Sequence, residues 1–274
     1  MKASIMLLLG ILLVSPQVFA RMTRTVEKTF TSVPGADLTV ETAGGDIRVI
    51  AGTGNEVKVT ATLQIDASST AKADQLQREL DLQITQQGQA VSARANYPNS
   101  GWHWGSWPPI AVSFTVLVPS RYNTSLSTSG GNIELAGVSG RAHLSTSGGN
   151  LNISRVEGEV DGRTSGGDIV VESLRGQLSA STSGGNIRAG IDGMLKGDVH
   201  LSTSGGDVDV SVDKATRFDL RSHTSGGDID ASGFPIVIDP DGKTENSLSG
   251  KVNGGGPQLV LKTSGGDIRI HAHR

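Results

Sequence analysis

The sequence predicts an all-β protein, a β-solenoid (β-helix-like) of stacked coils of about 18–21 residues, with one short helix in its N-terminal part. A six-residue phrase, TSGGDI, recurs with close variants at spacings of mostly 18 or 21 residues, and a period near 20 is typical of solenoids. Glycine makes up 37 of the 274 residues and aromatic residues only 4%, a balance that favours tight turns and small side chains. Apolar and polar residues alternate on both sides of each phrase, which indicates short strands.

Eight copies of the phrase define the coils. The first is the looser TAGGDI at 42–47, and the other seven follow at 128–133, 146–151, 164–169, 182–187, 203–208, 224–229 and 263–268. Apolar residues recur two and four positions before the threonine and five and seven positions after it, as in Leu126, Ile133 and Leu135. Each coil therefore supplies two strands joined by a corner, and stacking the coils at about 4.8 Å pairs every strand edge.

The corner itself has a readable chemistry. Adjacent glycines permit a backbone with positive φ, and we expect this to be the reason for the glycine pair. Aspartate and asparagine exchange freely in the next position, as at Asp168 and Asn186. Since both carry a carbonyl-type oxygen, this column is expected to be structural, accepting hydrogen bonds from nearby amides.

The chain divides into three expected parts. Residues 1–20, MKASIMLLLGILLVSPQVFA, have the basic start, short apolar run and small final residue of a signal peptide cleaved after Ala20. Residues 21–119 are a strand-rich part with a short helix near 69–82, and residues 120–274 are the repeat solenoid, continuous with it. Within 21–119, strands are expected at 37–49, 57–65, 82–84, 90–95 and 110–118.

The helix candidate is SSTAKADQLQRELDL at 68–82. Ser68 or Ser69 can cap its start, and Ala71, Leu76 and Leu80 form a weak apolar stripe. Near the other end of the chain, the rhythm breaks between residues 233 and 257. A loop is expected there, followed by a degenerate coil at 253–256, and the last TSGGDI coil is expected to cap the stack.

All three tryptophans of the chain lie in one Gly-, Pro- and Ser-flanked stretch, at Trp102, Trp104 and Trp107. This composition indicates a surface loop, and exposed aromatic rings can stack on sugars or on partner proteins. The alternative is that the loop folds over the open apolar end of the solenoid. His103 is a further candidate contact residue.

A second candidate is an acidic patch. Asp207, Asp209, Asp228 and Asp230 occupy the same outward positions of two coils that are consecutive in the sequence. We expect those coils to be neighbours, so that the four carboxylates lie close together and a weakly bound calcium ion would relieve their repulsion. A hydrated acidic face, partly neutralised by Arg188, is the alternative.

Several classes of function lack support in the sequence. There is no cysteine, and the net charge of −3 argues against nucleic acid as the main partner. No G-x-S-x-G elbow and no phosphate-binding glycine loop before a helix is present. We therefore expect no enzyme activity, no cofactor and no transmembrane helix after signal cleavage.

The predicted export signal, the strand-rich start with one helix, and the serial TSGG[DN]I coils closing on GGGPQLVLKTSGGDI together resemble the bacterial family called "putative adhesin", a domain of unknown function. The resemblance covers nearly all of residues 30–274 and implies a β-strand repeat in the periplasm or at the cell surface, with no catalytic residues to carry over. Envelope-stress sensing is a further possibility by analogy with the family alone.

The sequence thus predicts a non-catalytic, exported cell-envelope protein, an adhesin or envelope scaffold, whose partner is an envelope or surface glycan or protein. The alternative is a glycan-binding or glycan-cleaving protein that uses the loop from Trp102 to Trp107 and the four aspartates.

Overall fold

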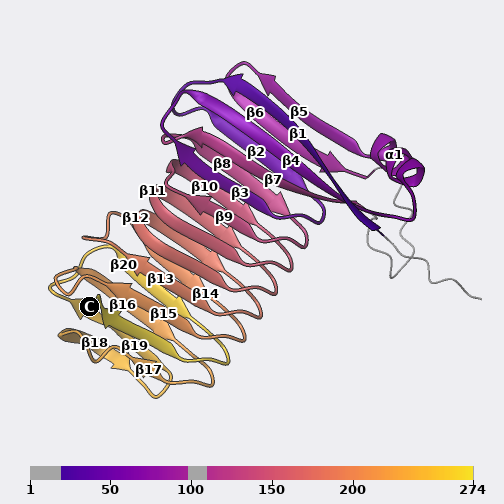
Figure 1. The fold of residues 1–274 in the computed structure, drawn as a ribbon. Coiled ribbons are helices and arrows are strands. Elements are labelled where there is room, and N and C mark those ends of the chain that lie inside the picture. Colours follow the sequence, from indigo (N-terminus) through magenta and orange to yellow (C-terminus); the bar gives the residue numbers. More distant parts are fainter. Residues whose placement is uncertain (1–19, 98–109, 274) are drawn as a thin grey trace, which may run out of the picture.

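The computed structural model describes residues 20–97 and 110–273, which form 21 strands and one helix. Figure 1 shows the strands stacked along one axis, with the single helix at the N-terminal end. The expected all-β solenoid with one short helix is confirmed.

Each coil contributes one strand before its Gly-Gly corner and one strand after it, and the coils stack into two layers. We call them the pre-corner layer and the post-corner layer. In spatial order the pre-corner layer contains β2 (Asp37–Thr42), β8 (Asn123–Thr128), β10 (Ser139–Ser145), the second halves of β11 (Leu151–Arg163) and β12 (Ile169–Ser181), β14 (Val199–Ser202), β20 (Gln258–Lys262) and β16 (Phe218–His223). The post-corner layer contains β3 (Ile47–Gly52), β9 (Ile133–Ala136), the first halves of β11 and β12, β13 (Ile187–Ile191), β15 (Val208–Val212), β21 (Ile268–Ala272) and β17 (Ile229–Asp230).

The apolar core lies between these two layers. Inward residues of the pre-corner strands, such as Leu126 and Leu144, and of the post-corner strands, such as Ile133, are fully buried. At Gly162 an added Cβ would lie 3.2 Å from the Leu151 side chain of the opposite layer. The layers therefore approach closely, and the core is narrow enough to need few large side chains.

Two side chains of the corner bind the neighbouring coil, each in seven of the eight copies. The buried threonine donates its hydroxyl to the carbonyl of the second glycine of that coil at 2.8 or 2.9 Å, as Thr164 does to Gly149 and Thr182 to Gly167. The Asp or Asn side-chain Oδ1 accepts the amide N–H of the equivalent residue one coil further on, at 2.7–2.9 Å. Only Oδ1 takes part, so aspartate and asparagine are equivalent, and the structural role expected for this column is confirmed.

The reason expected for the glycine pair is wrong. No glycine of the phrase has a positive φ among the described residues. The second glycine is needed because coils approach closely: an added Cβ would lie 1.9–2.2 Å from a backbone carbonyl oxygen of the neighbouring coil. A second glycine column, Gly140, Gly158 and Gly176 at the return turns, shows the same close approach and does have positive φ.

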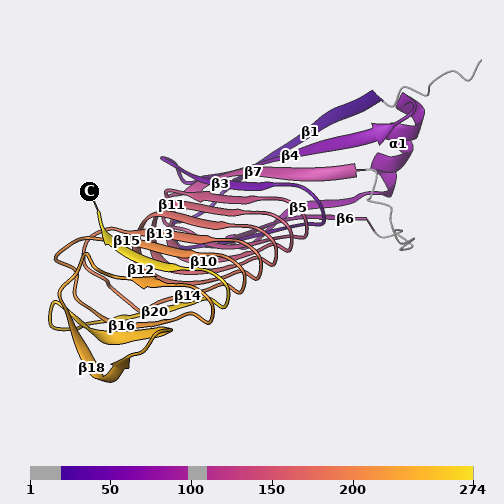
Figure 2. The ribbon, with the colours of Figure 1, turned by 90° about the horizontal axis from the view of Figure 1, so that it is seen from below.

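The N-terminal end of the stack is closed by antiparallel strands and the helix. β1 (Ala20–Thr31), β4 (Glu56–Ala67) and β7 (Ile110–Pro119) extend the post-corner layer, and the hairpin of β5 (Asp81–Gln87) and β6 (Ala90–Asn96) extends the pre-corner layer. Figure 2 shows α1 (Thr70–Glu79) at the outer end of these strands. Arg24 of β1 binds Asp74 and Gln77 of α1.

Helix α1 begins where the sequence predicted, since the Ser69 side chain accepts the amide of Lys72. The expected apolar stripe is partly wrong: Ala71 is exposed, and Ala73 packs in the core together with Leu76. Among the described residues, no helix is long and apolar enough to cross a membrane.

The C-terminal coil lies inside the stack, which corrects the expectation that it caps the stack. β20 pairs with β14 on one side and β16 on the other, and β21 pairs with β15 and β17. The last coil of the chain is therefore inserted between two coils that precede it in the sequence. The first coil, β2 and β3, is likewise enclosed, because β6 and β7 cover its outer side.

The segment expected to be a loop is a β-hairpin. β18 (Ile236–Lys243) pairs with β19 (Ser247–Val252), and β19 pairs antiparallel with β16. Residues 253–256 are a turn, not a degenerate coil. Phe234 packs edge-on against Phe218 at the end of the core, with ring centroids 5.9 Å apart. The edge strand β18 carries Pro240 within an irregular stretch, which discourages further strand pairing.

The two glycines of one corner provide a matched test of the close approach. A Cβ at Gly167 would lie 2.1 Å from the Gly149 oxygen, whereas a Cβ at Gly166 would make only ordinary contacts, the nearest at 3.6 Å. We expect Gly167→Ala to lower the free energy of unfolding by about 1–3 kcal/mol. Gly166→Ala is expected to change it by less than about 0.5 kcal/mol. Denaturant unfolding followed by circular dichroism measures both, and equal stability of the two variants would contradict the close approach.

Candidate functional site

The tryptophan site predicted from the sequence lies outside the described residues, which include none of Trp102, His103, Trp104 and Trp107. The described residue Tyr97, just before this stretch, donates its hydroxyl to the Glu79 carboxylate at 2.8 Å. Burial and this bond raise the pKa of Tyr97 to about 12, and the same bond helps to lower the pKa of Glu79. The stretch is therefore preceded by a residue anchored to α1.

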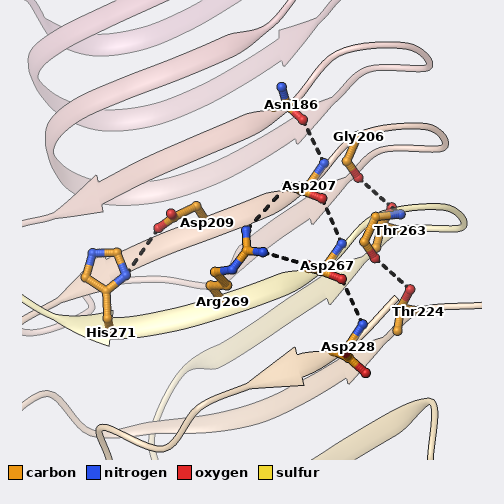
Figure 3. Close-up of polar contacts among 11 residues, drawn as sticks. Asn186, Gly206, Asp207, Asp209, Thr224, Asp228, Thr263, Asp267, Arg269 and His271 are labelled. Atoms are coloured by element: carbon orange, nitrogen blue, oxygen red, sulfur yellow. Dashed lines mark hydrogen bonds and ion pairs between the residues drawn. The ribbon is translucent and has the colours of Figure 1, made fainter. Parts of the chain in front are cut away.

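The four aspartates do not form the expected patch, because the coils that carry them are not neighbours. The inserted coil places Asp267 between Asp207 and Asp228 (Figure 3). It also places Arg269 between Asp209 and Asp230 in the strand register. Among the described residues, no group of three or more His, Asp or Glu side chains is arranged to hold a metal ion.

Three of these four aspartates, Asp207, Asp209 and Asp230, have a partner for their carboxylate among the described residues. Arg269 contacts Asp207 Oδ2 at 3.3 Å and Asp267 Oδ2 at 2.5 Å, and His271 Nδ1 lies 3.2 Å from Asp209 Oδ1. Ser232 donates hydrogen bonds to Asp230, and these lower the pKa of Asp230 below its ordinary value. The bond from the main-chain amide of Ser232 has the largest effect. The expected calcium site and the expected pair of catalytic carboxylates both required the coils of Asp207 and Asp228 to be neighbours. In the structure β21 lies between them.

The outward row of the post-corner layer instead alternates in charge. In spatial order it reads Arg188, Asp209, Arg269 and Asp230 on β13, β15, β21 and β17. If the coils stacked in sequence order, Asp209 and Asp230 would face each other, and like charges directly opposite are destabilising. The charges therefore favour insertion of the last coil.

Engineered cysteines can test the insertion in a chain that has no cysteine of its own. In the pair Asp209→Cys/Arg269→Cys the two residues are on adjacent strands about 4.8 Å apart, within the reach of a disulfide. In the pair Asp209→Cys/Asp230→Cys they are separated by β21, about 10 Å apart. We expect the first pair to oxidise to a disulfide and the second to keep free thiols, measured by mass spectrometry. The opposite result would mean that the coils stack in sequence order.

Three hollows lie on the outer face of the pre-corner layer and its terminal strands. One of about 490 Å³ includes Glu41, Arg94 and Ser127, and one of about 310 Å³ includes Arg221, His223 and Lys262. The third, of about 530 Å³, crosses β2, β8, β10 and β11, and we call it the central groove. This outer face is the candidate functional surface.

The central groove is lined by two register rows of outward side chains. One row reads Thr39, Ser125, His143 and Asp161, and the other reads Asp37, Asn123, Arg141 and Glu159. These two rows were not predicted from the sequence. The available clue was the coil length of 18: residues 125, 143 and 161 are each 18 apart and therefore neighbours in space.

Ser125, His143 and Asp161 follow one another in register, an order that invites comparison with a catalytic triad. His143 Nδ1 lies 3.3 Å from Asp161 Oδ2, but the Ser125 hydroxyl makes no hydrogen bond in the described part of the chain. The three residues are half to fully exposed on an open sheet face. An activated serine requires a bonded base, so the row supports binding better than catalysis.

These features define a class: a two-layered β-solenoid with a hollowed polar outer face on its pre-corner layer. The model of the Toastrack DUF4097 family matches residues 120–271, more than half of the chain, and the chain therefore belongs to this family. The resemblance to the bacterial family called "putative adhesin" is confirmed.

Solved bacterial structures resemble the chain along most of its length. A "putative cell adhesion protein" from Clostridium sporogenes is 13% identical, with a TM-score of 0.42 over 91% of this chain and 100% of that one. A "putative adhesin" from Bacteroides fragilis is 11% identical, with a TM-score of 0.41 over 90% and 97%. One from Parabacteroides merdae is 12% identical, with a TM-score of 0.39 over 92% and 97%. At these values the three structures do not bear on what this chain binds. No curated protein matches the chain.

Proposed function

We propose that this chain is a non-catalytic, exported protein of the bacterial cell envelope, an adhesin or envelope scaffold that binds through the outer face of its pre-corner layer. The observation that carries the proposal is that all three hollows described above lie on this face. A surface hollowed at several places along a repeat suits an extended or repetitive partner, as the concave faces of other solenoids do.

The construction of the stack supports a role in rigid display. One continuous apolar core runs through the described part of the stack. Each coil is bound to the next by backbone hydrogen bonds and by the Thr and Asp or Asn side chains of the corner. Such a body does not need to change shape to present its outer side chains. A preorganised backbone loses little entropy on binding, which favours recognition by a fixed surface.

Export and partner remain parts of this proposal. Export rests on the signal-like residues 1–20, and the expected partner is an envelope or surface glycan or protein, without a cofactor and without nucleic acid. The tryptophan stretch stays a second candidate contact, and the experiment below separates it from the hollowed face.

Co-sedimentation of the purified chain with isolated envelope fractions tests the proposal. Ser127→Arg/Ser179→Arg places two bulky charges on the outer pre-corner face, and Asn152→Arg/Ser211→Arg places the same charges on the post-corner face. We expect binding by the native chain, a loss of several-fold in the first variant, and near-native binding in the second, with circular dichroism showing that both are folded.

The triple variant Trp102→Ala/Trp104→Ala/Trp107→Ala is the further arm. It is expected to keep most of the binding. Loss of binding in this variant alone would move the site to the tryptophan stretch, and absence of binding by the native chain would contradict the proposal as a whole.

A further inference from the structure

The central groove contains a set of polar groups whose arrangement points to a particular ligand chemistry. It lies on four adjacent strands, β2, β8, β10 and β11, which span about 14 Å at the usual strand spacing. Its floor consists of backbone fixed on both sides by parallel pairing. The backbone positions from which the lining side chains rise are therefore fixed.

Some groups in the groove are held by one another. Asn123 donates its side-chain amide to Asp37 Oδ1 at 2.9 Å and accepts the amide N–H of Arg141 at 3.1 Å. Asp161 binds His143 and also Arg163, at 3.3 and 3.0 Å. These bonds orient the carboxylates of Asp37 and Asp161, whereas the buried Oδ1 of Asp161 has no hydrogen-bond partner among the described residues.

Other groups in the groove are unengaged in the described part of the chain. The Arg141 guanidinium, the Glu159 carboxylate and the Ser125 hydroxyl make no side-chain hydrogen bond and no ion pair with any described residue. Arg141 and Glu159 are exposed and occupy the same register on adjacent strands. The groove thus offers a rigid donor fork, a two-oxygen acceptor and a hydroxyl side by side.

This combination matches the hydroxyl groups of a sugar. Neighbouring hydroxyls of a sugar ring both donate and accept, so a guanidinium can donate to one pair of oxygens while a carboxylate accepts from another. The groove holds three carboxylates, on Asp37, Glu159 and Asp161, which would repel a polyanion. A ligand that needs both donors and acceptors, and carries no net charge, fits this lining best.

We infer that the central groove binds an uncharged oligosaccharide, with Arg141, Glu159 and Ser125 as its contact residues. This inference rests on the proposed function and names the ligand class of the same face. It assigns recognition to a site that is distinct from both the tryptophan stretch and the four aspartates.

The test is titration of the purified chain with chitotriose, maltotriose and mannotriose, each uncharged, and with a heparin hexasaccharide as the anionic comparison, measured by calorimetry. We expect at least one neutral trisaccharide to bind and the heparin fragment to bind more weakly. Arg141→Ala removes charge-assisted hydrogen bonds and is expected to weaken binding about tenfold or more. Glu159→Gln is expected to weaken it less, because the amide keeps one acceptor.

Arg188→Ala is the matched control, since Arg188 is an exposed arginine at an outward position of the opposite layer. It should leave the affinity unchanged, and thermal melts should show all variants folded. Equal affinity of the native chain and Arg141→Ala, tighter binding of heparin, or no binding of any neutral trisaccharide would each overturn the inference. If the chain still sediments with envelope fractions in that last case, the proposed function stands and only the ligand class fails.

Discussion

The close contact between successive corners is the constraint on which the rest of this protein depends. In seven of the eight corners the second glycine lies against the carbonyl of the equivalent glycine, and Gly45 of the first corner lies against that of Val112, with no room for a Cβ in any of them. At that separation the threonine hydroxyl reaches the same carbonyl, and the Asp or Asn oxygen reaches the next amide. These bonds fix the register of every coil. That register aligns the outward side chains into rows, and these rows line the hollows of the outer face.

The same corner explains how coils distant in the sequence can be neighbours in space. Any two coils present identical donors and acceptors, so the corner alone does not say which coil stacks on which. The choice is made by what differs between coils. On the post-corner face the alternation of Arg188, Asp209, Arg269 and Asp230 favours the inserted order. The identical corners stabilise the contact between any two coils, and the different outer residues determine which coils become neighbours.

The sequence was sufficient for the fold class, the corner position, the strand periodicity and the start of the helix, because each depends on local pattern. It was insufficient for the spatial order of the coils, which depends on long-range pairing of β20 and β21. That error made Asp207 and Asp228 seem adjacent, and with them a calcium site. The central groove was missed for a related reason: His143 and Asp161 look isolated until residues one coil apart are placed side by side.

The most direct test of the corner ladder is native-state hydrogen exchange of the amides in the Asp/Asn column. These amides belong to an exposed turn, yet those of Asn150, Asp168 and Asn186 each donate to an Oδ1 of the neighbouring coil. We predict that they exchange as slowly as amides of the buried strands. The amides of residues 193–197, for which no backbone hydrogen bond is found, are the fast reference. Exchange of the column at the rate of that reference would contradict the account.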